Sequence, residues 1–413
     1  MSVRRFGGLA LLPFISLLVP FLILPIISRT ASQGEVAALG IGDSIGAMVA
    51  LIGAYGWPLT GPARVANLSP LRAAHAFAES IVPRLIIFVI ALLPAGLVAA
   101  VLAPADSFGI VALAVLASAV GALSPSWFLV GRSQPALLAL YDTVPRALAG
   151  LGAVVLVATT KDVIWYPMCL LVGTCAGQIA FMVRTGAAHW VVRRSSWQRA
   201  GRVLQAEIPA ALAMVSGGVY SSATVSLVAI GGSVQVVAIY GMADRLFKAS
   251  LTAVVASANA VQGWVSEDSS HQSLAARGRR AVAVLGGIGV VGAVGIALLA
   301  PWVTDWFFGP EYRIDYLASS MIGLAFLSIA LNTALGRLIL VPFGQVGIVT
   351  ASTVVGAIFG VPAIIVGAWL GGVAGAAAGF AVSEALVTAV QAVAVMGLRR
   401  RLMTAPSERS ADL

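Results

Sequence analysis

Three charged residues stand close together in a stretch that is otherwise long and apolar enough to cross a membrane. The stretch covers residues 236–261 and holds Asp244, Arg245 and Lys248. A helical span takes about 20 apolar residues, and each charge at mid-membrane costs about 2.5–3.5 kcal/mol. Spacings of three and four residues place the charges on one broad helix face. That face therefore needs a protein interior or a water-filled cavity beside it.

One carboxylate can neutralise only one of the two cations, so this cluster carries a surplus positive charge. One interpretation is a structural ion pair, with Lys248 reaching towards the membrane interface. The other is a cationic patch inside a translocation cavity, which would attract an anionic substrate. On the second interpretation Arg245 and Lys248 bind the substrate, and Arg29 and Arg64 are further candidates to line the cavity.

Carboxylates inside apolar segments are candidate ligands for a coupling ion such as a proton or sodium. Asp244 is one, and Asp43 lies early in the second apolar segment. Glu384 lies in the last segment, where a buried polar contact is the competing interpretation. We identify no catalytic residue and no metal site, and we expect no cofactor.

The composition predicts a membrane protein. Of 413 residues 60% are hydrophobic and only 10% are charged, and the mean hydropathy is +0.99. A soluble domain is nearer half apolar and a quarter charged. No phosphate-binding loop is present, so we expect no built-in ATPase, and no basic and aromatic run suggests nucleic acid. Cys169 and Cys175 share one apolar segment, and we interpret them as packing residues.

Twelve apolar segments can be counted, each near the length of one bilayer crossing. Their approximate bounds are 9–28, 39–60, 80–103, 107–130, 143–160, 163–183, 207–230, 234–260, 281–304, 316–341, 345–369 and 371–398. With the N-terminus inside, the inner loops hold 20 of the 25 Lys and Arg residues, Arg84 among them, and the outer loops hold three. The sequence predicts an all-α polytopic protein with about 12 transmembrane helices and both ends cytoplasmic.

The two halves of the chain resemble each other. Pro13 and Pro209 open their first helices, and residues 38–45 align with 239–246, which places Asp43 opposite Asp244. Six helices per half would enter the membrane in the same direction, as in transporters with parallel repeats. We predict a six-helix lobe at 1–190, a cytoplasmic amphipathic linker at 191–206, a six-helix lobe at 207–398 and a basic, disordered tail at 399–413.

Prolines and glycines mark possible bends and close contacts. Pro13, Pro20 and Pro25 break the first segment, which predicts either a bent packing helix or a bend that changes during transport. Small residues spaced by four in the last two segments favour close helix packing. They are Gly356, Gly360, Gly371, Gly375 and Gly379.

Several motifs resemble those of polysaccharide and oligosaccharide flippases. The chain opens with LLPFISLLVPFLILPIISR, followed by GEVAALGIGDSIG and YGWPLTGPARVA. Residues 127–131, WFLVG, resemble a W-F/Y-x-x-G motif at the end of the fourth helix. Residues 240–246, YGMADRL, resemble a Y-x-x-A-D-R-L stretch in the eighth. These features are similar to Wzx-like members of the multidrug/oligosaccharidyl-lipid/polysaccharide (MOP) exporter superfamily, which includes the MATE transporters.

This resemblance implies a function and partners. It implies a bacterial cell-membrane transporter that flips a polyprenyl-diphosphate-linked oligosaccharide from the inner to the outer leaflet for polysaccharide assembly. The lipid-linked oligosaccharide, membrane lipids and other polysaccharide-assembly proteins are the implied partners. Alternatives are an ion-coupled, MATE-like exporter of small molecules, and a membrane enzyme of polysaccharide assembly, which the short outer loops disfavour.

Overall fold

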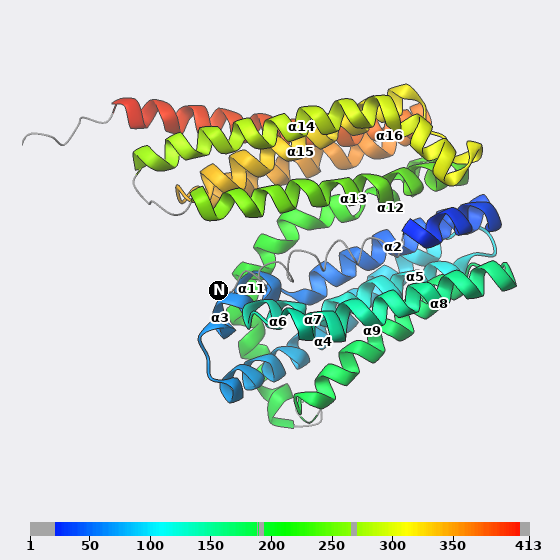
Figure 1. Ribbon diagram of the computed structural model, residues 1–413, viewed down its shortest axis with the longest axis horizontal. Helices are drawn as coiled ribbons and strands as arrows, with labels where there is room; N and C mark the ends of the chain where they lie inside the picture. The colour runs from blue at the N-terminus through cyan, green and yellow to red at the C-terminus, as the bar shows by residue number, and fades with distance from the viewer. Residues whose placement is uncertain (1–20, 188, 190–193, 266–270, 405–413) are drawn as a thin grey trace, which may run out of the picture. The chain divides into compact units, whose positions relative to one another are not determined.

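The computed structural model describes residues 21–187, 189, 194–265 and 271–404, and within these ranges the chain is helical with no strand. Figure 1 shows the helices. The helix Phe21–Thr30 covers the described part of the first predicted segment. Every later predicted segment coincides with helix, so the all-α membrane fold is confirmed. The elements as far as residue 184 are α2 (Gln33–Ala54), α3 (Trp57–Ala66), α4 (Pro70–Leu102), α5 (Phe108–Ala119), η1 (Val120–Leu123), α6 (Ser126–Gly131), α7 (Pro135–Leu138), η2 (Ala139–Thr143), α8 (Val144–Thr160) and α9 (Trp165–Arg184).

The later elements include the two longest helices, α14 and α16. In chain order, the later elements are α11 (Arg194–Ser222), α12 (Thr224–Gly231), α13 (Val234–Val265), α14 (His271–Phe308), η3 (Pro310–Tyr312), α15 (Tyr316–Asn332), η4 (Thr333–Leu340) and α16 (Val346–Thr404). Helix α16 is one run of 59 residues, but the backbone at Gly371 and Gly372 is not helical. This kink falls between the last two predicted segments, which therefore form two arms.

Eight helices in the described part of the chain are long and apolar enough to cross a membrane. They are Gln33–Ala54, Pro70–Leu102, Phe108–Gly131, Pro135–Thr160, Trp165–Arg184, Arg277–Phe308, Tyr316–Leu340 and Val346–Leu398. Large apolar side chains cover their outer faces, for example Val101 at 81% exposed and Val291 at 75%. In water such faces would be costly, whereas in lipid they are the expected surface.

Residue contacts divide the chain into two compact units. Unit 1 contains residues 1–246, 302–314 and 368–373, and unit 2 contains residues 247–301, 315–367 and 374–413. The division falls inside α13, directly after Leu246, rather than in the predicted linker at 191–206. The predicted lobes remain a prediction. Residues 191–193 of that linker, Pro13, Pro20 and residues 405–413 of the tail lie outside the described residues.

Helix α2 is the central helix of unit 1. It packs tightly on α5 because Gly42 and Gly46 leave room for the neighbouring backbone. A Cβ atom built at Gly42 would lie 2.7 Å from the carbonyl oxygen of Val111, and one at Gly46 would lie 2.5 Å from that of Val115. Side chains of any size are thus excluded from this interface, and α2 is held against α5.

A second close approach joins α2 to the first half of α13. Gly40 and Gly241 face each other, since a Cβ built on either would lie 3.8 Å from the Cα of the other. These two glycines are equivalent in the predicted repeat, three residues before Asp43 and Asp244. The crossing therefore brings the two aligned stretches together at matching positions.

Aromatic side chains form a buried cluster at another end of unit 1. Trp57, Phe77, Trp127 and Phe128 are each less than 9% exposed and contact one another with ring centroids 5.1–6.1 Å apart. These rings lie in a packed core between α3, α4 and α6. Gly61 provides the space for the Trp127 indole.

Unit 2 is built on the predicted small-residue contacts. The two arms of α16 meet where Gly356 and Gly360 face Ser383, and where Gly379 faces the Ala363 carbonyl. Gly375 faces Gly367 in the same way. Close packing through these glycines is confirmed, while Gly371 instead lies at the kink with open space around it. In Figure 1 these arms lie beside α14 and α15.

Candidate functional site

Arg245 of α13 pairs with Asp43 of α2 beside the crossing at Gly40 and Gly241. The guanidinium Nη2 donates to Asp43 Oδ2 at 2.5 Å, and the hydroxyl of Ser118 in α5 donates to Asp43 Oδ1 at 3.1 Å. The Arg245 side chain is 17% exposed and that of Asp43 33%. Three helices therefore position one charge-assisted contact, and the carboxylate keeps some access to solvent.

Asp244 lies on the more buried side of α13. Its residue is 7% exposed, and the hydroxyl of Thr224 in α12 donates to Oδ1 at 3.2 Å. Ser44, the neighbour of Asp43, is also buried and donates to the carbonyl of Ser222 at 2.7 Å. Asp43 and Asp244 thus occupy equivalent sequence positions but bind different partners.

The pairing changes the charge balance that the sequence suggested. In the sequence, Asp244 is the one acidic residue close to Arg245 and Lys248, so one of the two positive charges was expected to be unneutralised. Asp43 of α2 is a second carboxylate beside this cluster, and it neutralises Arg245. The sequence had placed Asp43 among the coupling-ion ligands and Arg245 among the substrate-binding residues, and the structure joins the two.

The other predicted cavity cations lie apart from this pair within unit 1, or in unit 2. Arg29 is exposed at the end of the helix Phe21–Thr30. Arg64 pairs with Glu207 of α11 at 2.6 Å and lies over the ring of Trp57, 5.1 Å from its centroid. Lys248 belongs to unit 2, beyond the boundary in α13. Arg245 is thus a predicted cation that the structure joins to a predicted carboxylate, Asp43.

Glu207 is a buried carboxylate that the sequence analysis did not select. It is 2% exposed and also accepts a hydrogen bond from Thr60 at 3.0 Å. Its position at the start of the predicted apolar segment 207–230, two residues before Pro209, was the available signal. With Arg64 and Thr60 it fastens α3 to α11.

Glu384 is the predicted ion ligand of unit 2. It is 5% exposed, and Asn332 of α15 donates its Nδ2 amide to Oε2 at 2.9 Å. Phe247 packs edge-on against Phe326 and Phe380 in the same unit. The carboxylate is therefore a buried group with a neutral donor, which leaves both predicted interpretations open.

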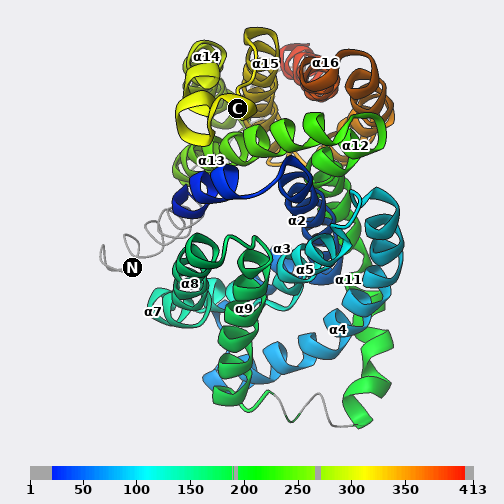
Figure 2. The same ribbon diagram turned by 90° about the vertical axis from the view of Figure 1, so that its right-hand side faces the viewer.

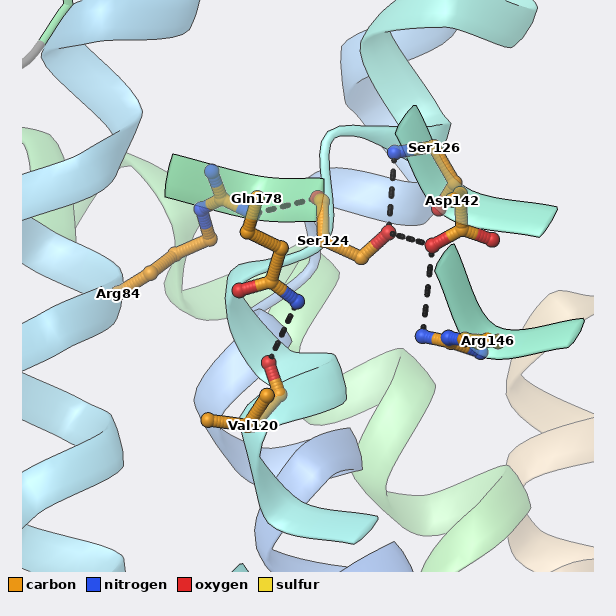
Figure 3. A network of polar contacts seen from close by, with 7 residues as sticks. All are labelled: Arg84, Val120, Ser124, Ser126, Asp142, Arg146 and Gln178. Atoms are coloured by element: carbon orange, nitrogen blue, oxygen red, sulfur yellow. Dashed lines mark hydrogen bonds and ion pairs between the residues drawn. The ribbon is translucent and has the colours of Figure 1, made fainter. Parts of the chain in front are cut away.

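Arg84 forms a second buried polar cluster, shown in Figure 3 with its neighbours. The sequence counted it as an inner-loop cation, which is wrong, because the residue lies inside α4 and is 1% exposed. Its guanidinium donates to the carbonyls of Ala122 and Ser124 at 3.3 and 3.1 Å and to the Ser80 hydroxyl at 3.0 Å. These carbonyls are free because the helix breaks between η1 and α6.

Helices α8 and α9 complete this cluster (Figure 3). The hydroxyl of Ser124 donates to Asp142 Oδ1 at 3.1 Å, and Asp142 pairs with Arg146 at 3.4 Å. Gln178 donates to the carbonyl of Val120 at 3.0 Å. These contacts surround the break in the helix at Ser124, so we assign this cluster to positioning the helices around the break. No group of three His, Cys, Asp or Glu side chains suited to a metal occurs among the described residues.

Comparisons with known proteins rest on the fold. No family model matches the chain, and no curated protein matches it in sequence. Among solved structures, the lipid II flippase MurJ in an inward closed conformation aligns with a TM-score of 0.71 and 11% identity, covering 96% of this chain and 88% of that one. An inward-facing MATE family multidrug resistance transporter of the MOP superfamily aligns with a TM-score of 0.60 and 15% identity, covering 95% and 100%.

A variant of the MATE transporter VcmN from Vibrio cholerae aligns over 98% of this chain and 97% of its own, with a TM-score of 0.57 and 15% identity. The similarity extends over the whole chain, although the sequences share few residues. The chain therefore has the all-α membrane fold of the MOP superfamily transporters.

Proposed function

We propose that this chain is a transporter that moves a polyprenyl-diphosphate-linked oligosaccharide from the inner to the outer leaflet of the cell membrane. The observation that carries the proposal is the Arg245–Asp43 pair. A guanidinium donates to carboxylate and to phosphate oxygens with the same planar geometry. A diphosphate can therefore take the place of Asp43 as the partner of Arg245.

This exchange supplies a coupling step. While the pair is closed, Asp43 is ionised and neutralised by Arg245. When the diphosphate binds the Arg245 guanidinium, Asp43 loses its partner. Asp43 then binds a proton or a sodium ion, which neutralises its charge. Release of the substrate restores the pair. The polyprenyl tail stays in lipid, so only the polar head needs to cross.

A lipid-linked substrate agrees with the fold similarity to MurJ, which is described as a lipid II flippase. An ion-coupled exporter of small molecules is the second candidate. Asp244 and Glu384 are buried carboxylates on apolar helices, which favours it, and the MATE transporters share the same fold. The two candidates differ in the charge of the cargo: the first needs Arg245 free for an anion, whereas the second needs a free carboxylate for a cation.

The direct test follows the leaflet in which lipid-linked oligosaccharide accumulates. Cells depleted of the protein should accumulate the precursor on the inner leaflet, and the wild-type chain should reverse this. Arg245→Ala should fail to reverse it. Arg313→Ala provides a matched control, since Arg313, in the connection after α14, also pairs with an aspartate, Asp305 of α14, at 3.8 Å. An equal distribution in depleted and wild-type cells would end the proposal.

A further inference from the structure

An apolar groove runs between α8 and α9 in unit 1. Figure 2 shows the two helices side by side. Its volume is about 460 Å³, within the range of about 300–1,000 Å³ of small-molecule sites. The lining includes Leu148, Ala149 and Gly152 of α8 and Met168, Cys169 and Val172 of α9.

The rims of the groove are exposed and its floor is formed by small residues. Leu148 is 63% exposed and Val172 is 60% exposed, so the groove opens on the outside of the helix pair. A Cβ atom built at Gly152 would meet nothing within 4 Å, whereas one at Gly173 would lie 2.5 Å from the Ala149 side chain. Close contact at Gly173 holds the helices together, and the space remains beside Gly152. In a membrane-spanning pair, such an opening faces lipid.

Positive charge gathers at one end of this groove only. Arg184, at the end of α9, lies over the ring of Tyr141, 5.9 Å from its centroid, and pairs with no carboxylate among the described residues. Tyr141 lies three residues before Val144, which lines the inner end of the groove. Side chains on a helix lean towards its N-terminus, so Arg184 leans back towards the groove. Arg146 pairs with Asp142 and belongs to the cluster around Ser124, so Arg184 is the arginine that remains for a ligand at this end.

The opposite end carries no such surplus. Lys161 and Asp162 stand together in the connection between α8 and α9, and Trp165 closes the groove. The groove therefore has an apolar length, a cationic inner end and an aromatic outer end. This polarity matches a single lipid chain with a phosphate at one end.

We propose that the α8–α9 groove binds one anionic glycerophospholipid of the inner leaflet. One acyl chain lies along the groove past Gly152, and Arg184 contacts the phosphate. The predicted topology places Arg184 on the cytoplasmic side, where anionic lipids attract juxtamembrane arginines. This site is separate from the proposed transport site and does not depend on the nature of the cargo.

The test uses the full chain in nanodiscs with a phosphatidylglycerol that carries a photoreactive diazirine in its acyl chain. After illumination, mass spectrometry should locate label in the α9 peptide that contains Met168 and Val172. Unlabelled phosphatidylglycerol should compete better than phosphatidylcholine. Gly152→Phe should remove the label, whereas Gly96→Phe should not, because Gly96 is a membrane-facing glycine of α4 with equally open surroundings.

The arginine is tested separately from the groove. Arg184→Gln should reduce the advantage of phosphatidylglycerol over phosphatidylcholine about fivefold, the factor expected for one arginine at an anionic surface. Arg72→Gln, at an exposed arginine near the start of α4, should leave it unchanged. Leu148→Trp serves as a second blocking variant if Gly152→Phe does not fold.

Three results would overturn the proposal. Equal competition by the two phospholipids would show a groove without phosphate recognition. Undiminished labelling in both blocking variants would place the lipid elsewhere. Competition by a polyprenyl diphosphate but not by phosphatidylglycerol would assign the groove to the tail of the transported substrate.

Discussion

The Arg245–Asp43 pair makes a residue-scale prediction that separates stability from transport. Arg245→Ala should lower the amount of folded protein, because Asp43 keeps a charge in a partly buried site without its partner. Asp43→Asn combined with Arg245→Ala should restore the folded protein, since no charge is then unpaired, but transport should stay lost. Detergent-extracted, monodisperse protein and leaflet assays measure the two effects. If the double variant transports, the Arg245–Asp43 pair has a purely structural role.

Tyr312 provides a second residue-scale prediction, outside the membrane spans. It is buried in η3, and its hydroxyl finds no hydrogen-bond partner among the described residues. Burial, together with the charges of Glu311 and Glu35, raises the pKa of the phenol from 10.0 to about 12. The folded state thus keeps this proton more tightly than the unfolded state. Its contribution to stability is complete below pH 10 and is lost as the pH rises from 10 through 12.

Replacing this tyrosine should therefore change how the stability of the protein depends on pH above pH 10. Tyr312→Phe should be nearly neutral at pH 7, because it removes an unpaired hydroxyl from a buried site. Between pH 10 and 12 the variant should lose less thermal stability than the wild type. Melting temperatures across that range, with Tyr316→Phe at an exposed tyrosine as control, provide the measurement. Parallel curves for wild type and Tyr312→Phe would contradict the assignment.

At the scale of elements, α2 has one tight interface and one looser interface. A Cβ at Gly42 or Gly46 would meet the α5 backbone within 2.7 Å, whereas one at Gly241 would meet only ordinary contacts at 3.7–3.8 Å. Gly42→Ala should therefore destabilise the protein by about 1–3 kcal/mol, as overpacking does. Gly241→Ala should fold normally. Chemical denaturation in detergent compares the two, and equal stability would contradict a fixed α2–α5 interface.

The helices were predictable because hydropathy and length determine spans directly. Positions 371 and 372 were correctly read as the break between two segments, and Gly356 and Gly360 as helix contacts. Side-chain partners were not predictable to the same degree. Asp43 and Arg245 are 202 residues apart, so their pairing depends on the helix crossing. Arg84 was assigned to a loop because a single arginine near the edge of an apolar run resembles a loop residue. Its burial is possible because its guanidinium donates to the free carbonyls of Ala122 and Ser124.

At the scale of the whole molecule, the topology rests on the kink in α16. If α16 crossed the membrane once, the two ends of the chain would lie on opposite sides. The non-helical backbone at Gly371 and Gly372 divides it into two arms that pack on each other through Gly367 and Gly375. On the predicted count of twelve spans, two antiparallel crossings by α16 would return the C-terminus to the side of the N-terminus. Removing Arg84 from the loop count leaves the inner excess of cations large, so both arguments favour cytoplasmic ends.

Single cysteines introduced into a variant without Cys169 and Cys175 test this arrangement in intact cells. A membrane-impermeant maleimide should label position 371, which has open space around it, and position 313, whose arginine side chain is 53% exposed. It should label positions 345 and 194 only after the cells are opened. Labelling of 371 and 345 from the same side would mean that the first arm of α16 does not cross the membrane, and the count of twelve spans would then be wrong.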